Sequence, residues 1–436
     1  MDRSSKIALM EVIILCGCIA SVSYHYVAGI VMHWDFPFFT FLHRPENQFY
    51  DFIEPVANID QGHMPYPSGP AYSSGPPYPP MLLALVIALF RHNSIPVNFS
   101  LFLFLITFIY VYMRICYNYL RSESLPQSIR TCLIFSFCTY SFLYALDRAN
   151  FEVWSVLATA AAFGGFGAYG DFNKVKPWLA TISMAITLSF KPFAIFFLPA
   201  YAAQRTKREV CITLLLAAVF TICGLVALGP NMLATVHNLV HNMGALDKKF
   251  VIGTESMVNG SGIFMFLKLL SRWYYGNYSP HWVVPFEFGY SIFAGIATIC
   301  LFLYVWLVER DKWRQFTICA LAINLLPTIA FPYRLLYVNL AMMAFANVNV
   351  KQKNDWLYCT LFALVVMPMG YFFFSPREVS ETTLIEPLSM VALAVMIVRD
   401  GFGARRMAQL ANTTLGAEQC KLKHQGTAAA YSERGV

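Results

Sequence analysis

Charged side chains are scarce in this sequence. Asp, Glu, Lys and Arg make up 13% of its 436 residues and 58% of the residues are hydrophobic, whereas an ordinary soluble domain has about 25% charged residues. So few polar side chains cannot cover a globular domain in water. The composition therefore excludes a soluble globular protein, a disordered chain and a nucleic-acid-binding protein. Apolar runs near the length of a membrane-crossing helix recur along most of the chain, so we expect an all-α polytopic membrane protein.

Other absences narrow the class further. None of the 11 cysteines lies in a long polar loop, so no disulfide framework is predicted. No internal repeat is visible, which argues against solenoids and against transporters built from repeats. The sequence also lacks a phosphate-binding glycine loop. The apolar stretch 7–32 follows a short basic start and is longer than the apolar part of a signal peptide, so we expect it to be a first membrane helix.

The apolar runs predict where the chain crosses the membrane. Single helical spans are expected at about 7–32, 98–119, 131–146, 151–169, 209–229, 284–308, 315–330, 334–349, 356–374 and 383–398. The stretch 178–203 is long for one span and has Lys191-Pro192 at its middle. A charge there costs about 2.5–3.5 kcal/mol, and proline removes a backbone hydrogen bond. We expect a hairpin of two short helices, which gives about twelve spans.

The distribution of positive charge selects this topology. If 81–90 crossed the membrane and 178–203 crossed it once, several basic residues would face outward, against the positive-inside rule. With 81–90 at the interface and a hairpin at 178–203, they face the cytoplasm, as do both termini. The residues that decide between the two topologies are Arg121, Arg130, Lys174 and Lys176.

Two long loops then lie on the non-cytoplasmic side, at 33–97 and 230–283. Because every other outer connection is short, we expect these loops to build a site over the bundle. Residues 1–399 are predicted to form one transmembrane domain. The polar segment 400–436 is predicted to be a disordered cytoplasmic tail.

The first loop carries carboxylates between aromatic residues. Asp35 lies in His33-Trp34-Asp35-Phe36, and Asp51 lies in Phe49-Tyr50-Asp51-Phe52. Partial desolvation raises the pKa of such an acid toward working pH, which suits a general base. An interfacial carboxylate that caps a helix or is simply solvated is the open alternative for either acid.

Asp51, Ala57, Gly62 and Tyr66, followed by Tyr78-Pro79-Pro80 before an apolar helix, resemble the signature of glycosyltransferase family 87. That family comprises polyprenol-phosphate-mannose-dependent mannosyltransferases and relatives of the GT-C superfamily. The likeness covers about residues 10–350. It implies a GT-C-like bundle of about twelve transmembrane helices with two large non-cytoplasmic loops.

Three downstream segments are similar to further motifs of the family. They are Asp147-Arg148-Ala149-Asn150-Phe151 at the entrance to a helix, Ser189-Phe190-Lys191-Pro192, and Val258-Asn259-Gly260-Ser261. Two departures are visible. The chain reads Pro332-Tyr333-Arg334 where such enzymes often have a histidine pair, and Lys191 is followed directly by proline.

The resemblance implies a membrane glycosyltransferase that moves a hexose, in particular mannose, from a polyprenyl-phosphate-sugar donor to a lipid or glycan acceptor with inversion. Asp51 would be the catalytic base. Lys191 and Arg334 would bind the donor phosphate. The residues assigned to sugar or acceptor are Tyr66, Tyr78, Asp147, Asn150 and Asn259.

Each assignment has a structural alternative. Lys191 could extend its amine to the interface and Arg334 could anchor a helix end. Asp147 and Asn150 could form an ordinary helix start, and tyrosines are enriched at any membrane interface. No metal site is predicted, because His237 and His241 lack a matching Glu motif. No cofactor is assigned either, although a divalent cation stays an open alternative.

Two other functions stay open as well. One is a lipid-linked sugar flippase or transporter, which would need ionisable groups along a path through the bilayer. The other is an envelope polysaccharide polymerase or ligase with large outer loops. We expect a multi-pass protein of the bacterial inner membrane, in contact with lipid and with no nucleic-acid partner.

Overall fold

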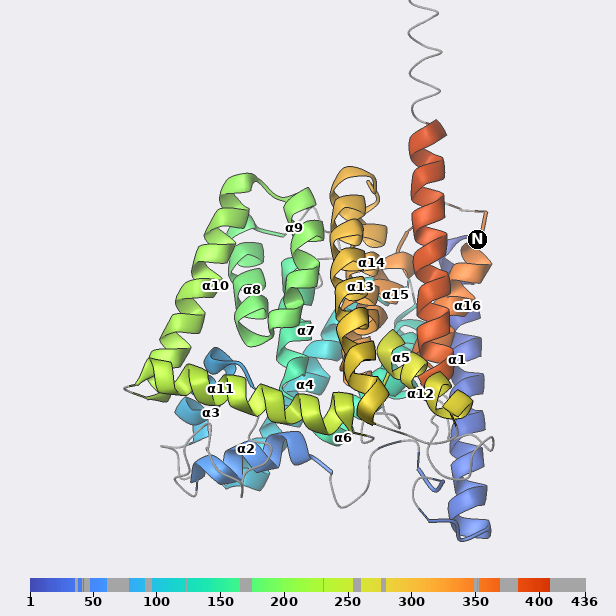
Figure 1. Ribbon diagram of the computed structural model, residues 1–436. Coiled ribbons are helices and arrows are strands. Elements are labelled where there is room, and N and C mark those ends of the chain that lie inside the picture. Colours follow the sequence, from blue (N-terminus) through green and yellow to red (C-terminus); the bar gives the residue numbers. More distant parts are fainter. Residues whose placement is uncertain are drawn as a thin grey trace, which may run out of the picture.

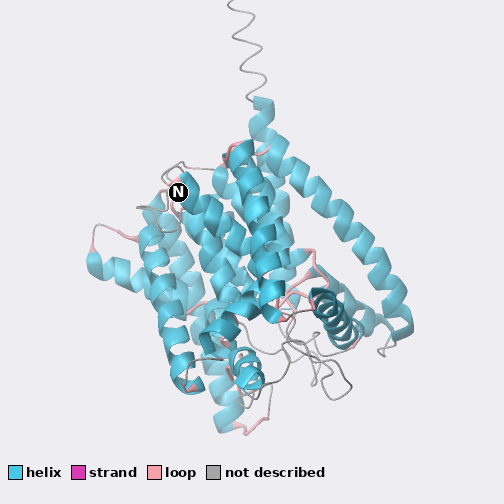
Figure 2. Ribbon diagram, turned by 90° about the vertical axis from the view of Figure 1, so that its left-hand side faces the viewer, coloured by secondary structure: helices cyan, strands magenta, loops and turns pink. Residues whose placement is uncertain are grey.

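The computed structural model describes residues 1–35, 38–40, 42, 48–60, 78–90, 96–122, 124–164, 175–229, 231–253, 260–275, 280–348, 351, 353–368 and 383–407. Within these ranges the regular elements are helices, and none of the residues lies in a strand (Figure 2). The prediction of an all-α chain is therefore confirmed for the described part.

The helices follow one another as α1 (Arg3–Tyr26), η1 (Val27–Val31), α2 (Tyr50–Asp60), α3 (Pro80–Phe90), α4 (Val97–Leu120), α5 (Leu125–Phe137), α6 (Tyr140–Arg148), α7 (Glu152–Ala162), α8 (Pro177–Phe190), η4 (Pro192–Phe197), α9 (Leu198–Gln204), α10 (Lys207–Leu228), α11 (Met232–Leu246), η5 (Asp247–Ile252), α12 (Ile263–Tyr275), α13 (Pro280–Leu307), α14 (Lys312–Leu325), η7 (Pro332–Leu335), α15 (Leu336–Ala346) and α16 (Asp355–Val366). A last helix covers 383–407.

Four helical segments of the described chain are long and apolar enough to cross a membrane: Arg3–Val31, Val97–Leu120, Lys207–Leu228 and Trp282–Leu307. The pair α5 and α6, bent by 62°, makes a fifth span if it is counted as one. Several other predicted spans are shorter helices here. The 14 residues of α14 rise by only about 21 Å at 1.5 Å per residue, less than a hydrocarbon core of about 30 Å. The twelve spans stay a prediction.

Most of the long helices run side by side, and α2, α11 and α12 lie together at one end of the bundle (Figure 1). These three helices belong to the predicted outer loops 33–97 and 230–283, which therefore contain helices rather than only irregular chain. Helix α11 runs across the direction of α10 and α13 (Figure 1). Residues 400–407 continue the last helix past the predicted domain boundary, and 408–436 lie outside the described residues.

The predicted break at Lys191-Pro192 is confirmed. Helix α8 ends at Phe190, Lys191 has extended dihedral angles (φ −148°, ψ 117°), and the 3-10 helix η4 begins at Pro192. A residue before proline is disfavoured in the helical region, so the local sequence accounts for this break. Because of this break, Lys191 lies between α8 and η4 and belongs to neither helix.

A second break, in predicted span 131–146, was not expected. Helices α5 and α6 are separated at Cys138 and Thr139, without a proline or glycine. The Thr139 hydroxyl donates to the carbonyl oxygens of Phe135 (3.3 Å) and Ser136 (2.9 Å), which competes with the helical hydrogen bonds. Beyond the bend, α6 ends at Arg148, which contacts Asp51 in the site described below.

Close packing of α10 against α3 positions the start of α3. A Cβ added at Gly224 of α10 would lie 2.5 Å from the backbone nitrogen of Met81 and 2.7 Å from the carbonyl carbon of Pro80. These are backbone atoms, so relief requires the two helices to separate. Tyr78, two residues before α3, belongs to the polar site, and the spacing of the helices therefore affects the site.

Replacement of Gly224 with alanine is expected to destabilise the fold by about 1–3 kcal/mol through overpacking. Thermal unfolding in detergent measures the effect. Gly289→Ala in α13 is the matched control, because an added Cβ there meets nothing within 4 Å. It should leave stability unchanged or raise it by up to about 1 kcal/mol. Equal melting temperatures for the two variants would contradict the close approach.

Candidate active site

Helix α2 places Asp51 against the bundle. Its neighbour Phe52 is fully buried, with ring centroids 5.1 Å from Phe104 of α4 and 5.2 Å from Phe151. The Tyr78 hydroxyl donates to the backbone oxygen of Asp51 at 2.9 Å. Aromatic burial on one side and this hydrogen bond on the other hold the first turn of α2 in place.

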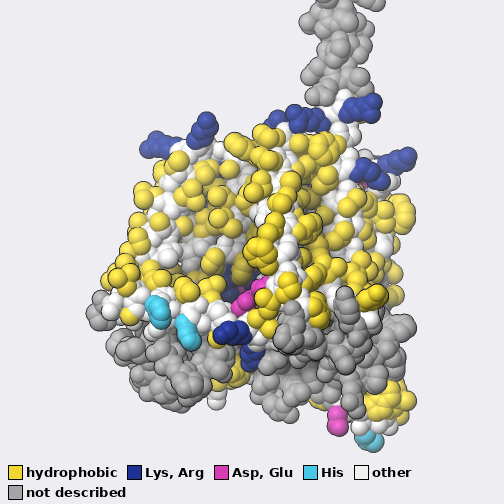
Figure 3. All heavy atoms as spheres, viewed as in Figure 1, with side chains coloured by type: hydrophobic (Ala, Val, Ile, Leu, Met, Phe, Trp, Pro, Cys, Tyr) yellow, Lys and Arg dark blue, Asp and Glu magenta, His cyan; other side chains and the backbone are white. Residues whose placement is uncertain are grey.

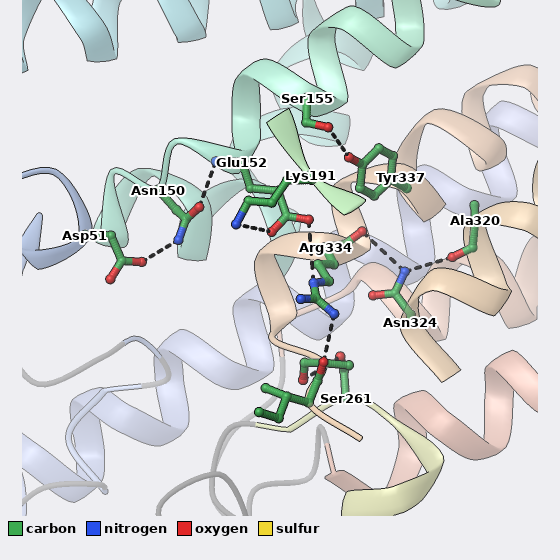
Figure 4. A network of polar contacts seen from close by, with 12 residues as sticks. Asp51, Asn150, Glu152, Ser155, Lys191, Ser261, Ala320, Asn324, Arg334 and Tyr337 are labelled. Atoms are coloured by element: carbon green, nitrogen blue, oxygen red, sulfur yellow. Dashed lines mark hydrogen bonds and ion pairs between the residues drawn. The ribbon is translucent and has the colours of Figure 1, made fainter. Parts of the chain in front are cut away.

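The segment between α6 and α7 receives the Asp51 carboxylate. Arg148 Nη2 donates to Asp51 Oδ1, and Asn150 Nδ2 donates to Asp51 Oδ2 at 2.6 Å. Ala149 between them has left-handed dihedral angles (φ 47°, ψ 43°), which direct the chain from one helix into the next. Asn150 Oδ1 accepts the Glu152 N–H at 2.7 Å, so its amide group bridges Asp51 and the start of α7 (Figure 4).

Glu152 continues the cluster toward two cations. Lys191 Nζ lies 3.5 Å from Glu152 Oε2, and Arg334 Nε lies 3.5 Å from Glu152 Oε1 (Figure 4). All three residues are buried. Neither carboxylate oxygen of Glu152, nor Arg334 Nε, has a hydrogen-bond partner in the described chain. Because buried polar atoms are normally hydrogen-bonded, these unsatisfied atoms mark a place where a polar ligand could bind.

Contacts with aromatic rings and with a backbone oxygen hold Lys191 and Arg334 in position. The Arg334 guanidinium lies 4.3 Å from the centre of the Phe193 ring, and its Nη1 donates to the Ile329 oxygen at 2.8 Å. Lys191 Nζ lies 5.3 Å from the centre of the Tyr78 ring. Both contacts are in the range of cation–π interactions. Phe193 belongs to η4, so η4 and η7 bring Lys191 and Arg334 together from distant parts of the sequence.

Further hydrogen bonds attach the surrounding chain to η7. Asn324 Nδ2 donates to the Arg334 oxygen at 3.3 Å and to the Ala320 oxygen at 2.8 Å. The backbone N–H of Ser261 donates to the Ala330 oxygen at 3.0 Å (Figure 4). Ser261, the last residue of the predicted motif at 258–261, therefore lies at the edge of the same cluster.

The structure brings the predicted site residues Asp51, Tyr78, Asn150, Lys191 and Arg334 into one region. Asp147 is buried at the end of α6, and its backbone oxygen accepts the Phe49 N–H at 2.7 Å. The predicted roles of these residues toward sugar or acceptor stay predictions. Tyr66 and Asn259 lie outside the described residues.

Sequence reasoning did not place Arg148 and Glu152 in the site, although both contact its residues. The sequence places Arg148 at the entrance to a helix and predicts no role for it, although its guanidinium donates to the predicted base Asp51. Glu152 falls at the start of predicted span 151–169, where an acid is costly. For Glu152 the available signal was an ionisable residue inside a predicted span, because such residues usually mark a functional site. Arg148 lies between the predicted spans 131–146 and 151–169 and had no such signal.

Two further carboxylates lie near the outer loop segments. Glu54 follows Asp51 by one turn of α2, and burial above all raises the pKa of its carboxyl, with the charge of Asp51 acting in the same direction. Asp35 instead lines a cavity of about 610 Å³ at the end of α1, together with His25, His33 and Trp34. None of the residues lining that cavity belongs to the cluster formed by Asp51, Asn150, Glu152, Lys191 and Arg334, called here the Asp51 cluster.

No group of three His, Cys, Asp or Glu side chains among the described residues could hold a metal ion.

An apolar helical chain with a buried cluster of acids and cations defines a membrane protein with a polar site inside the bundle. Residues 77–332, more than half of the chain, match glycosyltransferase family 87, and the chain belongs to that family. It is therefore a membrane glycosyltransferase. No curated protein and no solved structure matches the sequence. The matched range includes Tyr78, Asn150, Glu152 and Lys191, whereas Asp51 precedes it.

Proposed function

We propose that this glycosyltransferase moves a hexose, with mannose as the first candidate, from a polyprenyl-phosphate-sugar donor to a lipid or glycan acceptor on the non-cytoplasmic face of the membrane. The observation that carries the proposal is the continuous polar cluster from Asp51 through Asn150 and Glu152 to Lys191 and Arg334. It places a carboxylate at one end and two cations at the other, as an acid-base step and a phosphate leaving group require.

Asp51 has the geometry of an oriented base. Each carboxylate oxygen accepts one hydrogen bond, from Arg148 or from Asn150, and each keeps a further lone pair for an acceptor hydroxyl. The hydroxyl oxygen attacks the anomeric carbon from the face opposite the phosphate, its proton passes to Asp51, and the configuration at that carbon inverts.

Lys191 and Arg334 suit the leaving group. When the bond between the anomeric carbon and the phosphate oxygen breaks, the electron pair stays on the phosphate, which changes from a singly charged diester to a doubly charged monoester. Cations held in a buried site stabilise charge that develops in this way. Arg offers a planar fork to the phosphate oxygens and Lys a point charge.

The surface supports access from the membrane and the proposed orientation. Acidic and basic side chains lie in a hollow of the otherwise apolar surface above α11 (Figure 3). Most of the visible Lys and Arg side chains gather at the other end of the molecule (Figure 3). Positive residues stay on the cytoplasmic side of a membrane, so the Asp51 cluster would lie toward the opposite face.

The test is a transfer assay with the purified protein in liposomes. Labelled polyprenyl-phosphate-mannose should donate its sugar, and the product should have the inverted anomeric configuration by NMR. In a parallel reaction, the enzyme should not transfer sugar from an oligosaccharide-pyrophosphate lipid. Transfer only from the pyrophosphate lipid would favour a polymerase or ligase, and movement of the lipid between leaflets without transfer would favour a flippase. Repeating the assay with EDTA decides whether a divalent cation takes part.

A further inference from the structure

Glu152 lies between the two cations that the proposed function assigns to the donor phosphate. Its two carboxylate oxygens face Lys191 and Arg334 at 3.5 Å each. With two cations and one carboxylate, the group carries a net charge of +1 instead of +2. A site selected only for tight phosphate binding would gain nothing from a buried acid at this position, because the acid repels the phosphate.

Holding the cations in place does not account for Glu152. The Arg334 guanidinium is already bound by the Ile329 oxygen and packed on Phe193. The ion pairs of Glu152 are long, and its oxygens lack a hydrogen-bond partner within the described chain. A buried ion pair without good hydrogen bonds contributes little net stability, because desolvation offsets the Coulomb attraction.

A role for Glu152 follows from the charge of the bound phosphate, which changes during the proposed transfer. In the proposed transfer the acceptor oxygen forms a bond to the anomeric carbon, the bond from that carbon to the phosphate oxygen breaks, and the hydroxyl proton passes to Asp51. The bound phosphate therefore enters with one negative charge and leaves with two. A cation group of net charge +1 matches the donor, whereas one of +2 would match the product.

We infer that Glu152 is a positioning residue whose negative charge lowers the net positive charge around the bound phosphate. The site therefore discriminates against the doubly charged polyprenyl phosphate, and release of this product is promoted. The inference rests on the proposed function. Product release limits turnover in many enzymes, and tight binding of the leaving phosphate would slow each cycle. Glu152 acts on the phosphate through its charge, beside the two residues that contact it.

The experiment measures the affinities of farnesyl phosphate and of farnesyl methyl phosphate for the full-length protein in detergent at pH 8. The two lipids have the same tail and differ by one negative charge. Glu152→Gln removes the charge and keeps the shape of the side chain. It should raise the ratio of monoester affinity to diester affinity about tenfold, because the second negative charge of the monoester is no longer repelled by the Glu152 carboxylate. Glu152→Asp should keep the ratio of the unchanged protein.

A double variant and a matched control test the charge argument itself. Glu152→Gln combined with Lys191→Gln restores the net charge of +1, so the ratio should return to its original value while both affinities fall. Glu309→Gln removes another buried acid, one that accepts from Tyr304 at 2.7 Å between α13 and α14. It should leave the ratio unchanged. If Glu152→Gln alone does not fold, the double variant is compared with Lys191→Gln, and removal of the Glu152 charge in that background should raise the ratio by the same factor of about ten.

The outcomes separate this inference from the proposed function. An unchanged ratio in Glu152→Gln, or an equally raised ratio in the double variant, would overturn the role of Glu152 while leaving the phosphate site in place. If the unchanged protein binds neither lipid, the proposed donor itself is wrong.

Discussion

Asp51→Asn is expected to reduce sugar transfer by about 10²–10⁴-fold, the contribution typical of a positioned general base. Asparagine has nearly the same shape, and its side-chain oxygen can still accept from Arg148 or Asn150. It cannot take a proton from the acceptor hydroxyl. The measurement is the initial rate of transfer from polyprenyl-phosphate-mannose, with thermal unfolding recorded on the same samples to show that the variant is folded.

Two other acids are the controls for this prediction. Asp35→Asn changes a carboxylate in the separate cavity at the end of α1, and Glu54→Gln changes the carboxylate one turn further along α2. Both should retain most of the activity. Full activity in Asp51→Asn together with loss in Asp35→Asn would move the base to the α1 cavity. Loss in Glu54→Gln alone would move it along α2, where the raised pKa of Glu54 would suit a base at neutral pH.

Local chemistry made part of this fold predictable. The break at Lys191 follows from the proline after it, which restricts the backbone of the preceding residue. Apolar runs likewise predicted α1, α4, α10 and α13 to within a few residues. The bend between α5 and α6 was not predictable in this way, because it arises where the Thr139 hydroxyl competes for helical carbonyl groups rather than at a proline or glycine.

Single residues of the candidate site could be predicted from the sequence, whereas the contacts between them could not. The resemblance to the family signature singled out Asp51, and Lys191 and Arg334 stood out as cations beside apolar runs on the same predicted face. Their arrangement depends on contacts between residues far apart in sequence, such as Asn150 with Asp51 and Phe193 with Arg334. No local pattern contains those distances. Glu152 was hidden because the apolar residues after it dominate predicted span 151–169, so that a single acid did not change the interpretation of the segment.

The charges of the cluster indicate why the proposed phosphate site would need both cations. Asp51 and Glu152 bring two negative charges, and Arg148, Lys191 and Arg334 bring three positive ones, so the five residues have a net charge of +1. Arg148 is paired with Asp51. The remaining positive charge therefore belongs to Lys191 and Arg334, which share Glu152. Loss of either cation would leave a neutral group around Glu152 and no net attraction for a phosphate.

Lys191→Gln and Arg334→Gln are each expected to lower turnover by about 10²–10³-fold, as for loss of one donor to a developing oxyanion. Arg334→Lys keeps the charge but loses the planar fork, so its loss should be smaller, about tenfold. Turnover and donor KM are measured on folded protein. Lys6→Gln is the matched control, because Lys6 is a buried cation paired at 3.3 Å with Asp355 elsewhere in the bundle. It should lower stability and leave the donor KM unchanged. If the Lys191 and Arg334 variants lose stability in the same way but keep turnover, the two cations only hold the bundle together.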